Sequence, residues 1–373
     1  MPYPRIVEEF LELVRIPTHS YKERAIAEVL KNKLLSLGCH VEEDTAGAAI
    51  NGEANNLIAR WPGRQDREPI LFSAHMDRVS NPGQINSVVN LNDDRITSDG
   101  QTILAADDIS GLVSILEGLR LIEAEGTEHG DVEIVFSVAE EVGLQGARQL
   151  DATRIKSQYG YILDSSGSVG TIVNRAPTQK TVTVKIHGLS SHAGMAPEKG
   201  INAIMAGAIA LSKIKEGRLS PITTSNFGVI HGGKATNIVC DYLVIKGEAR
   251  SHNEDELADY ITHVNEIFTN TILEFGARVE ISWDLEYSSF YVKEDDPVIT
   301  LADKAFKNLG LKTQIITGGG GMDGNIYNEK GIKSVGLSTG YQNVHTEKEE
   351  QSISQLILCS RAVAEIIKAA PPK

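Results

Sequence analysis

Short apolar runs alternate with amphipathic stretches along this 373-residue sequence, which restricts the folds open to it. The runs at residues 69–74, 132–138 and 159–163 are bounded by polar or glycine-rich turns, as buried strands are. Residues 109–121 place apolar side chains at helical spacing after a pair of aspartates, either of which can cap the helix. This alternation predicts an α/β sandwich with a mostly parallel sheet.

The middle of the chain has a different pattern, with strands that are apolar on one face only. Residues 181–186 alternate polar and apolar side chains, as a half-buried strand does. One-sided strands with two helices predict a smaller α+β domain inserted into the larger one. We expect a main domain at residues 1–174 and 290–373 and an inserted domain at residues 175–289. The inserted strands are expected at 181–186, 226–230, 243–248 and 278–283, and its helices at 202–215 and 255–271.

The charge balance excludes several classes of partner. Lysine and arginine number 36 against 50 aspartates and glutamates, a formal net charge of −14. Nucleic acid and anionic membranes attract basic surfaces, so neither is expected as a partner, whereas metal ions and ammonium groups suit the chain better. No apolar run approaches the roughly 20 residues of a transmembrane helix, and the first residues do not form a secretory signal. Three scattered cysteines favour a reducing cytoplasm over a disulfide framework.

Acidic or imidazole side chains follow five predicted strand ends, where functional groups gather in an open α/β sheet. Each has an ordinary interpretation: a hydrogen-bonded histidine, a helix-capping aspartate or a solvated glutamate pair. Two adjacent glutamates beside an apolar strand nevertheless need a compensating cation, because like charges near buried structure repel. Five such ends together therefore favour a metal centre. The residues are His75 and Asp77, Asp107 and Asp108, Glu140 and Glu141, Asp164, and His345.

This set of side chains suits particular metal ions. Imidazole and carboxylate ligands fit Zn²⁺, Co²⁺ or Mn²⁺, and the lack of nearby cysteines argues against a purely structural zinc site. A carboxylate shared between two ions would hold a bridging water as hydroxide. One of the adjacent glutamates would then be a base that binds no metal, and its neighbour a ligand. Asp77 could accept the second N–H of His75 and set its tautomer.

Seven short motifs, taken in order, resemble the co-catalytic di-zinc exopeptidases, a family that includes peptidase T, carboxypeptidase G and aminoacylase. Each motif is weak alone, but their order and spacing are specific, and the resemblance covers essentially the whole chain. The motifs are His75-Met76-Asp77, Ala106-Asp107-Asp108-Ile109-Ser110-Gly111, Glu140-Glu141-Val142-Gly143, Asp164, Gly188-Leu189-Ser190-Ser191-His192-Ala193-Gly194, Gly319-Gly320-Gly321-Met322-Asp323-Gly324-Asn325 and Val344-His345-Thr346.

The resemblance implies roles for the residues of the main domain. Two divalent ions, expected to be Zn²⁺ with Co²⁺ or Mn²⁺ as alternatives, would share Asp107 as a bridging ligand. Glu140 would be the general base, and Asp77 would orient His75. The peptide between Asp107 and Asp108 is often cis in the family. The implied metal ligands are His75, Asp107, Glu141, Asp164 and His345.

The resemblance also implies that the inserted domain is a lid through which the chain forms a homodimer. His192 would stabilise the oxyanion, in several members within the partner subunit's site, although it could be an ordinary loop histidine. Asn237 and Arg250 match lid positions that hold substrate, although Arg250 could equally be a surface arginine. Gly319 and Gly320, in the loop that runs to Asp323-Gly324-Asn325, look like a substrate cradle, whose ordinary interpretation is a flexible turn.

Details of the motifs favour one branch of the family. Asp164 agrees with the peptidase T and dipeptidase-like branches, whereas carboxypeptidase G and aminoacylase-like members more often have glutamate there. Residues 139–147 also resemble self-compartmentalising glutamyl-type aminopeptidases, which carry a different, β-rich insert. We therefore predict a cytoplasmic tripeptidase or aminopeptidase that cleaves short peptides from a free amino terminus. The alternatives are a carboxypeptidase or N-acyl-amino-acid amidohydrolase of the same family, and a metal-binding protein without catalysis.

Overall fold

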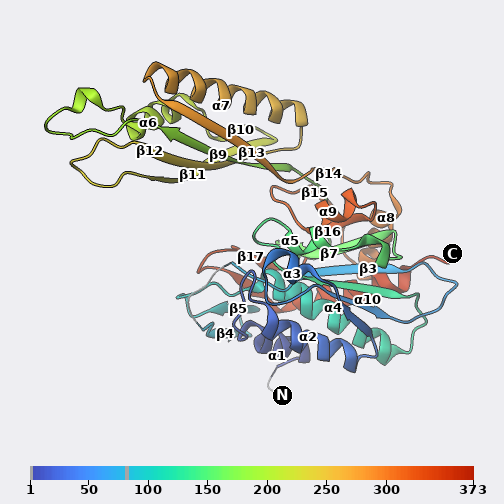
Figure 1. Cartoon of the computed structure of the whole chain (residues 1–373). Helices are drawn as coiled ribbons and strands as arrows, with labels where there is room; N and C mark the ends of the chain where they lie inside the picture. Colours follow the sequence, from blue (N-terminus) through green and yellow to red (C-terminus); the bar gives the residue numbers. More distant parts are fainter. Residues whose placement is uncertain (1–2, 80–83) are drawn as a thin grey trace. The chain divides into compact units, whose positions relative to one another are not determined.

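The computed structural model describes residues 3–79 and 84–373, which divide into two compact units (Figure 1). Unit 1 spans Met1–Ala176 and Phe290–Lys373, and unit 2 spans Pro177–Ser289. The sequence pattern predicts the edges of the inserted domain at residues 175 and 289. Each unit has its own sheet and its own apolar core.

A nine-stranded sheet forms the centre of unit 1. Its strands are β1 (His40–Glu43), β2 (Leu57–Trp61), β3 (Ile70–His75), β6 (Val132–Ser137), β7 (Tyr159–Ser165), β8 (Thr171–Ala176), β14 (Phe290–Tyr291), β15 (Gln314–Thr317) and β16 (Lys333–Ser338). Their order is β1-β2-β6-β3-β7-β16-β8-β14, with β15 paired to β8. The central pairs β6–β3, β3–β7 and β7–β16 are parallel, as is β15–β8. The predicted α/β class with a mainly parallel sheet is confirmed.

Helices pack on both faces of this sheet. They are α1 (Arg5–Val14), α2 (Arg24–Ser36), α3 (Ala46–Ile50), α4 (Ala106–Glu125), α5 (Gln145–Gln149), α8 (Pro297–Asn308), α9 (Asp323–Glu329) and α10 (Ile353–Ala369), with a 3-10 turn at Ala152–Arg154. On one face, α4 contacts α1 and α10, and α10 contacts α8. The Tyr161 hydroxyl of β7 donates to the Val298 carbonyl of α8 at 2.8 Å. On the other face, Ser73 of β3 bonds Tyr327 of α9 at 3.0 Å.

The central parallel strands end at one edge of the sheet. His75, the last residue of β3, is paired with Ser137, the last residue of β6. Ser338 at the end of β16 is likewise paired with Ser165 at the end of β7. Parallel register thus places the residues that follow β3, β6 and β7 beside one another. The strand end predicted before Asp107 is wrong, because residues 103–105 form no strand and Asp107 lies in the first turn of α4.

A small antiparallel sheet that the sequence pattern does not predict also belongs to unit 1. Its strands are β4 (Ser87–Asn90), β5 (Arg95–Ser98), β17 (Tyr341–Gln342) and β18 (Glu350–Ser352), in the order β17-β18-β5-β4. Strands of two to four residues are too short to show a recognisable alternation. The pairing of β18 with β5 brings the chain around His345 beside the segment that leads into α4.

Unit 2 is a five-stranded antiparallel sheet packed against two helices. Its strands are β9 (Thr178–His187), β10 (Gly217–Ser220), β11 (Thr223–Gly232), β12 (Tyr242–Ser251) and β13 (Arg278–Tyr287), in the order β10-β11-β12-β9-β13. The helices are α6 (Ala203–Lys213) and α7 (Glu254–Glu274), with a 3-10 turn at Pro197–Lys199. Asn202 and Asn253 cap the two helices through their side chains. The alternating residues Val182, Val184 and Ile186 of β9 enter the core, as the one-sided pattern predicts.

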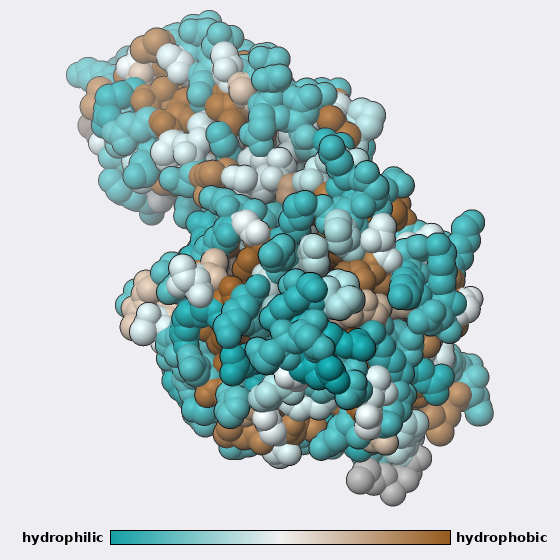
Figure 2. Space-filling model, turned by 90° about the vertical axis from the view of Figure 1, so that its right-hand side faces the viewer, coloured by the Kyte–Doolittle hydropathy of each residue, from teal (hydrophilic) through white to brown (hydrophobic). Residues whose placement is uncertain are grey.

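Hydrophilic residues cover most of the face drawn in Figure 2, and apolar residues occur there in small groups. Within the described part of the chain, no helix combines the length and apolar character that crossing a membrane requires.

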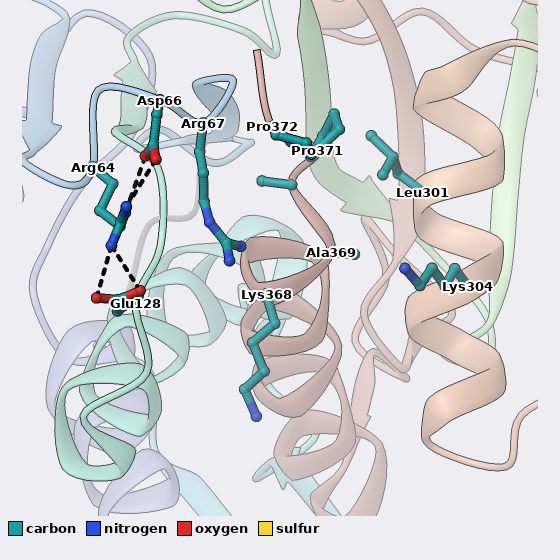
Figure 3. Close-up of a pocket in the computed structure, with 11 residues that line it drawn as sticks. Arg64, Asp66, Arg67, Glu128, Leu301, Lys304, Lys368, Ala369, Pro371 and Pro372 are labelled. Atoms are coloured by element: carbon teal, nitrogen blue, oxygen red, sulfur yellow. Dashed lines mark hydrogen bonds and ion pairs between the residues drawn. The ribbon is translucent and has the colours of Figure 1, made fainter.

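A surface cleft of about 550 Å³ lies beside the connection between β2 and β3 and the end of α10 (Figure 3). Arg67, which lines it, precedes the first residue of β3, so the cleft is at the opposite end of that strand from His75. Arg64 is held there by two ion pairs, to Asp66 at 2.8 Å and to Glu128 at 2.9 Å. The candidate site described below uses none of these residues.

Candidate metal centre

His75 ends β3 with its imidazole wholly inside the protein. Its Nε2 atom lies 2.9 Å from Asp107 Oδ1 and 3.9 Å from Asp164 Oδ1. Its Nδ1 atom lies 2.9 Å from the backbone carbonyl of Asp77. Burial lowers the pKa of His75, but hydrogen bonds to Asp107 and Asp77 raise it well above the ordinary value. This imidazole is therefore surrounded by acceptors, and Nε2 faces the carboxylates.

Asp107 lies between two histidines. One oxygen faces His75, and the other, Oδ2, lies 3.4 Å from His345 Nε2. His345 Nε2 is also 3.0 Å from Glu141 Oε1. Burial raises the pKa of Asp107, but hydrogen bonds to both histidines lower it below the ordinary value. Asp107 is therefore the carboxylate that can be shared between two cation positions.

Asp164, near the end of β7, completes the group on the His75 side. Its Oδ1 accepts the phenolic O–H of the buried Tyr341 at 3.1 Å. Burial, followed by the negative charge of Asp107, raises the pKa of Asp164 well above the ordinary value. A cation between these carboxylates would reverse that shift, because an opposite charge favours the ionised form.

Glu140 is buried beside this group. One of its carboxylate oxygens and one of Asp164 lie within 4.8 Å of a His75 ring nitrogen and of each other. Burial, followed by the charge of Asp164, raises the pKa of Glu140 well above the ordinary value. A carboxyl with a raised pKa near a cluster of ligands is suited to taking and returning a proton.

Asp77 holds the peptide that carries the two glutamates. Its Oδ1 accepts the backbone N–H of Glu140 at 2.9 Å, and its Oδ2 accepts that of Glu141 at 3.2 Å. The sequence predicts that the Asp77 side chain accepts the second N–H of His75. The shorter contact to His75 Nδ1 comes from the Asp77 carbonyl, since the carboxylate Oδ1 is 3.5 Å away. Asp77 thus supports both His75 and the glutamates.

Asp108 and Glu349 shape the segment that presents Asp107. Asp108 accepts the backbone N–H groups of His75 and of Gly111, each at 3.1 Å, so it caps α4 and joins it to β3. A Cβ atom at Gly111 would lie 2.5 Å from the Leu163 carbonyl oxygen, which explains the glycine. The buried Glu349 accepts N–H groups of Leu104, Ala105 and Asp107 at 2.8–3.1 Å. The Asp107–Asp108 peptide is cis.

The donor set fits divalent metal ions. Two imidazoles and four carboxylates converge at the carboxyl ends of the strands, and in the part of the chain that the structure describes no lysine or arginine pairs with these carboxylates. Two sets of three donors have ligand atoms within 4.8 Å of one another: His75, Asp107 and Glu141, and His75, Glu140 and Asp164. Nitrogen and oxygen donors without thiolates are the ligands of catalytic rather than structural zinc sites.

The model of peptidase family M20/M25/M40 matches residues 71–369. The chain belongs to this peptidase family. It is 38% identical over 366 residues to the uncharacterized protein YqjE of Bacillus subtilis, covering 98% of each chain. It is also similar to the crystal structure of a tripeptidase from Staphylococcus aureus, with a TM-score of 0.91 and 38% identity. The match covers 98% of this chain and 97% of the tripeptidase chain. The crystal structure of aminopeptidase PepT from Bacillus cereus gives a TM-score of 0.87, 38% identity and coverage of 98% of each chain.

The M20/M25/M40 peptidase is accordingly a metal-dependent peptide hydrolase, and the resemblance read from its seven motifs is confirmed. The structure brings His75, Asp77, Asp107, Glu140, Glu141, Asp164 and His345 together at one edge of unit 1. Their individual roles in metal binding and catalysis remain predictions.

The three candidate residues of unit 2 do not form one group of contacts. His192 and Asn237 are adjacent, because Ala193 donates its N–H to the Asn237 carbonyl at 3.0 Å. The His192 Nδ1 atom accepts the Gly194 N–H at 3.2 Å, and the imidazole is exposed. Arg250, by contrast, forms two hydrogen bonds to Glu248, at 2.9 and 3.1 Å. A substrate carboxylate would have to compete with that ion pair.

Gly319 and Gly320 lie in the loop between β15 and α9 of this M20/M25/M40 peptidase, and Gly319 is exposed. The loop leads to Asp323, the first residue of α9, which accepts a hydrogen bond from Ser137 at the end of β6. Burial raises the pKa of Asp323 to about 6. The loop therefore ends beside the strand edge that carries the glutamates, and its substrate role stays a prediction.

Several residues that support the site were missed by sequence reasoning. Tyr341 donates its hydroxyl hydrogen to Asp164, and Glu349 accepts the Ala105 N–H in the segment before Asp107. Ser20 donates its hydroxyl hydrogen to Asp77 Oδ2 at 2.6 Å. Ser20 is 57 residues from its partner, and Tyr341 is 177 residues from its own. No local pattern marks such residues, because their role depends on contacts between distant segments.

Proposed function

We propose that this protein is an aminopeptidase that cleaves short peptides, tripeptides among them, from a free amino terminus. The observation that carries the proposal is the position of Asp107 between His75 and His345, with Glu140 buried beside the same group. Similarity at 38% identity to a tripeptidase and to an aminopeptidase supports the choice of substrate.

Two divalent ions, Zn²⁺ by preference with Co²⁺ or Mn²⁺ as alternatives, would be held by five residues. Asp107 would be shared, His75 and Asp164 would complete one position, and Glu141 and His345 the other. When bound, such ions polarise a carbonyl and make a water molecule more acidic near neutral pH. The nitrogen and oxygen donors of these five residues, with no cysteine among them, suit this assignment.

Glu140 would be the general base and then the general acid. Its carboxylate takes a proton from the attacking water and delivers it to the amine of the departing product, so the carboxyl ends the cycle as it began. Burial of Glu140 supports this task, because it moves the pKa of the carboxyl upward toward the working pH. Asp77 keeps the Glu140 peptide in place through the hydrogen bond from its N–H.

Unit 2 would be the lid and dimerisation domain, with His192 stabilising the oxyanion and Asn237 and Arg250 contacting substrate. Gly319 and Gly320 of unit 1 would also contact substrate. Most of the exposed large apolar side chains among the described residues belong to unit 2, among them Met195, Met205 and Ile230. Such a concentration supports a homodimer through this unit. The three unpaired, buried cysteines are compatible with the reducing cytoplasm as the place of action.

The test is hydrolysis of one tripeptide in free, amino-blocked and carboxy-blocked forms, after chelation and re-addition of Zn²⁺, Co²⁺ or Mn²⁺. Metal-restored cleavage that requires a free amino terminus would support the proposal. Loss of cleavage on blocking the carboxylate as well would indicate a tripeptidase. Cleavage of the amino-blocked peptide would instead assign the protein to the carboxypeptidase or deacylase branch.

A further inference from the structure

Side-chain oxygens hold four consecutive backbone N–H groups around the proposed base. In helices and sheets, other backbone groups normally accept such N–H groups. Four consecutive side-chain acceptors are unusual. The loop that presents Glu140 is therefore fixed by side chains from other segments. The bonds are Val138 N–H to Asn56 Oδ1 at 3.1 Å, Ala139 N–H to Glu23 Oε1 at 3.0 Å, Glu140 N–H to Asp77 Oδ1 at 2.9 Å, and Glu141 N–H to Asp77 Oδ2 at 3.2 Å.

Ala139 is the residue of this loop that most needs such support. Its φ is +51°, in the left-handed region that residues with a Cβ atom rarely adopt. An unfavourable backbone conformation persists only where its surroundings hold it in place. The hydrogen bond from Ala139 to Glu23 acts on the residue directly before Glu140, so it constrains the backbone from which Glu140 projects.

Glu23 is buried and bonded where it can hold the Ala139 peptide. It precedes α2, has 0% of its surface exposed, and its Oε1 also accepts the Tyr21 N–H at 2.9 Å. Its other oxygen, Oε2, is buried and has no hydrogen-bond partner among the described residues. Burying a carboxyl group is costly unless hydrogen bonds compensate it, and the N–H groups of Tyr21 and Ala139 supply these bonds at Oε1.

Ser20 acts on the same loop from the same connection between α1 and α2. Its hydroxyl donates to Asp77 Oδ2 at 2.6 Å, the oxygen that also accepts the Glu141 N–H. Arg78 secures the beginning of this connection, donating to the carbonyls of Thr18, Val14 and Ile16 at 2.7–3.1 Å. The connection is thus fastened next to Asp77 at one end and supports Ala139 at the other.

We propose that Ser20 and Glu23 are positioning residues for Glu140: Glu23 holds the Ala139 peptide and Ser20 orients the Asp77 carboxylate. Neither touches the reacting atoms. The inference rests on the proposed function in one respect, since it takes Glu140 as the general base. Loss of Glu23 should displace the Glu140 carboxyl while the proposed metal ligands keep their places.

The experiment compares Glu23→Ala, Glu23→Gln and Ser20→Ala with a matched control, Glu133→Gln. Glu133 is also a buried glutamate that accepts backbone N–H groups, those of Lys156 and Ser157, but it lies near the start of β6, away from the site. For each variant the measurements are kcat and KM on a free tripeptide, bound metal, and amide hydrogen exchange of residues 137–141 in metal-free protein.

Glu23→Ala is expected to lower kcat by about 10- to 100-fold, because small misplacements of a catalytic group have effects of this size. KM and metal content should stay within about threefold of the wild type, and exchange at residues 137–141 should accelerate. Glu23→Gln keeps an acceptor for the Ala139 N–H and should restore most of kcat. Ser20→Ala should lower kcat less than Glu23→Ala, and Glu133→Gln should change neither kcat nor exchange at residues 137–141.

Wild-type kcat and exchange in a folded Glu23→Ala variant would overturn the inference. Equal losses in Glu133→Gln would do the same, because the effect would then be general destabilisation. If Glu23→Ala does not fold, Ser20→Ala decides, and an unchanged kcat in that variant contradicts the proposal. Normal turnover in Glu140→Gln would instead refute the assignment of the base in the proposed function.

Discussion

Asp77 accepts the backbone N–H of Glu140 at 2.9 Å, although the two residues are 63 positions apart in the chain. The same carboxylate accepts the Glu141 N–H, and the carbonyl of Asp77 lies 2.9 Å from His75 Nδ1. One residue therefore links a proposed metal ligand on β3 to both glutamates that follow β6. Hydrogen bonds to this one residue thus connect the ends of β3 and β6.

Replacing Glu140 by glutamine or alanine should abolish most turnover. General acid–base catalysis contributes about 10²- to 10⁴-fold, so kcat should fall by an amount in that range. Both ions should remain bound, because the proposed ligands are other residues. Steady-state kinetics and metal analysis of the purified variants check this, with Glu133→Gln as the buried-glutamate control. Near-normal turnover with two metals bound would show that Glu140 is not the base.

Replacing Asp77 by asparagine should weaken the site without removing a proposed ligand. An asparagine amide can accept one N–H through its oxygen, but its NH₂ group would face the Glu141 N–H and the Ser20 hydroxyl. Loss of a residue that orients ligands typically costs about 10- to 100-fold in metal affinity or activity. Competition with a chromophoric chelator and measurement of kcat would test this. Full affinity together with full kcat in Asp77→Asn would contradict the supporting role.

Chelation should lower the thermal stability of the folded protein, and metal should restore it. An ion that binds only the native state stabilises it by about 2.7 kcal/mol when the free ion concentration is 100 times its dissociation constant. Repulsion among the carboxylates of Asp107, Glu140 and Asp164 should increase the stabilisation by metal, because a bound cation relieves it. Burial raises the pKa values of Glu140 and Asp164. Differential scanning calorimetry with and without Zn²⁺ measures it. Asp107→Ala should lose most of the increment; an increment of wild-type size there would argue against Asp107 as the shared ligand.

Glu9 should make stability depend on pH through a contact far from the site. It is buried on α1 and lies 2.6 Å from Arg120 and 3.1 Å from Lys33. Burial raises the pKa of Glu9, but the contacts with Arg120 and Lys33 lower it below 4.5 overall. A depressed folded-state pKa stabilises the native state above the unfolded-state pKa, and that stability is lost as pH falls through the folded value.

Glu9→Gln should therefore reduce the free energy of unfolding by about 1–3 kcal/mol at pH 7, the cost of an unpaired buried polar group. The difference from the wild type should shrink as the pH falls below about 4.5, the ordinary pKa of the carboxyl. Urea unfolding at several pH values measures it. Glu53→Gln, which removes an exposed partner of Lys22, should change stability by less than about 1 kcal/mol. Identical pH profiles for Glu9→Gln and the wild type would refute the prediction.

The helices and strands with a clear period were predictable from the sequence. The run at 132–138 is β6 (Val132–Ser137), and the helix expected at 255–271 is α7 (Glu254–Glu274). The four-stranded sheet of β4, β5, β17 and β18 was not predictable from the sequence, because strands of two to four residues are too short to show a periodic pattern. That sheet matters for the site, since it carries the chain on either side of His345.

The sequence by itself determined the family, the α/β class and the types of side chain available to a metal, since these depend on ordered motifs and on residues that follow apolar runs. Tertiary structure alone decided which of these side chains meet. His345 and Glu141 are 204 residues apart, and the 3.0 Å between Nε2 and Oε1 depends on the packing of several strands. The contacts by which Ser20 and Glu23 support the loop of Glu140 also form only in the folded chain. Distances between distant segments follow from the packing of the whole core, and a local pattern does not contain them.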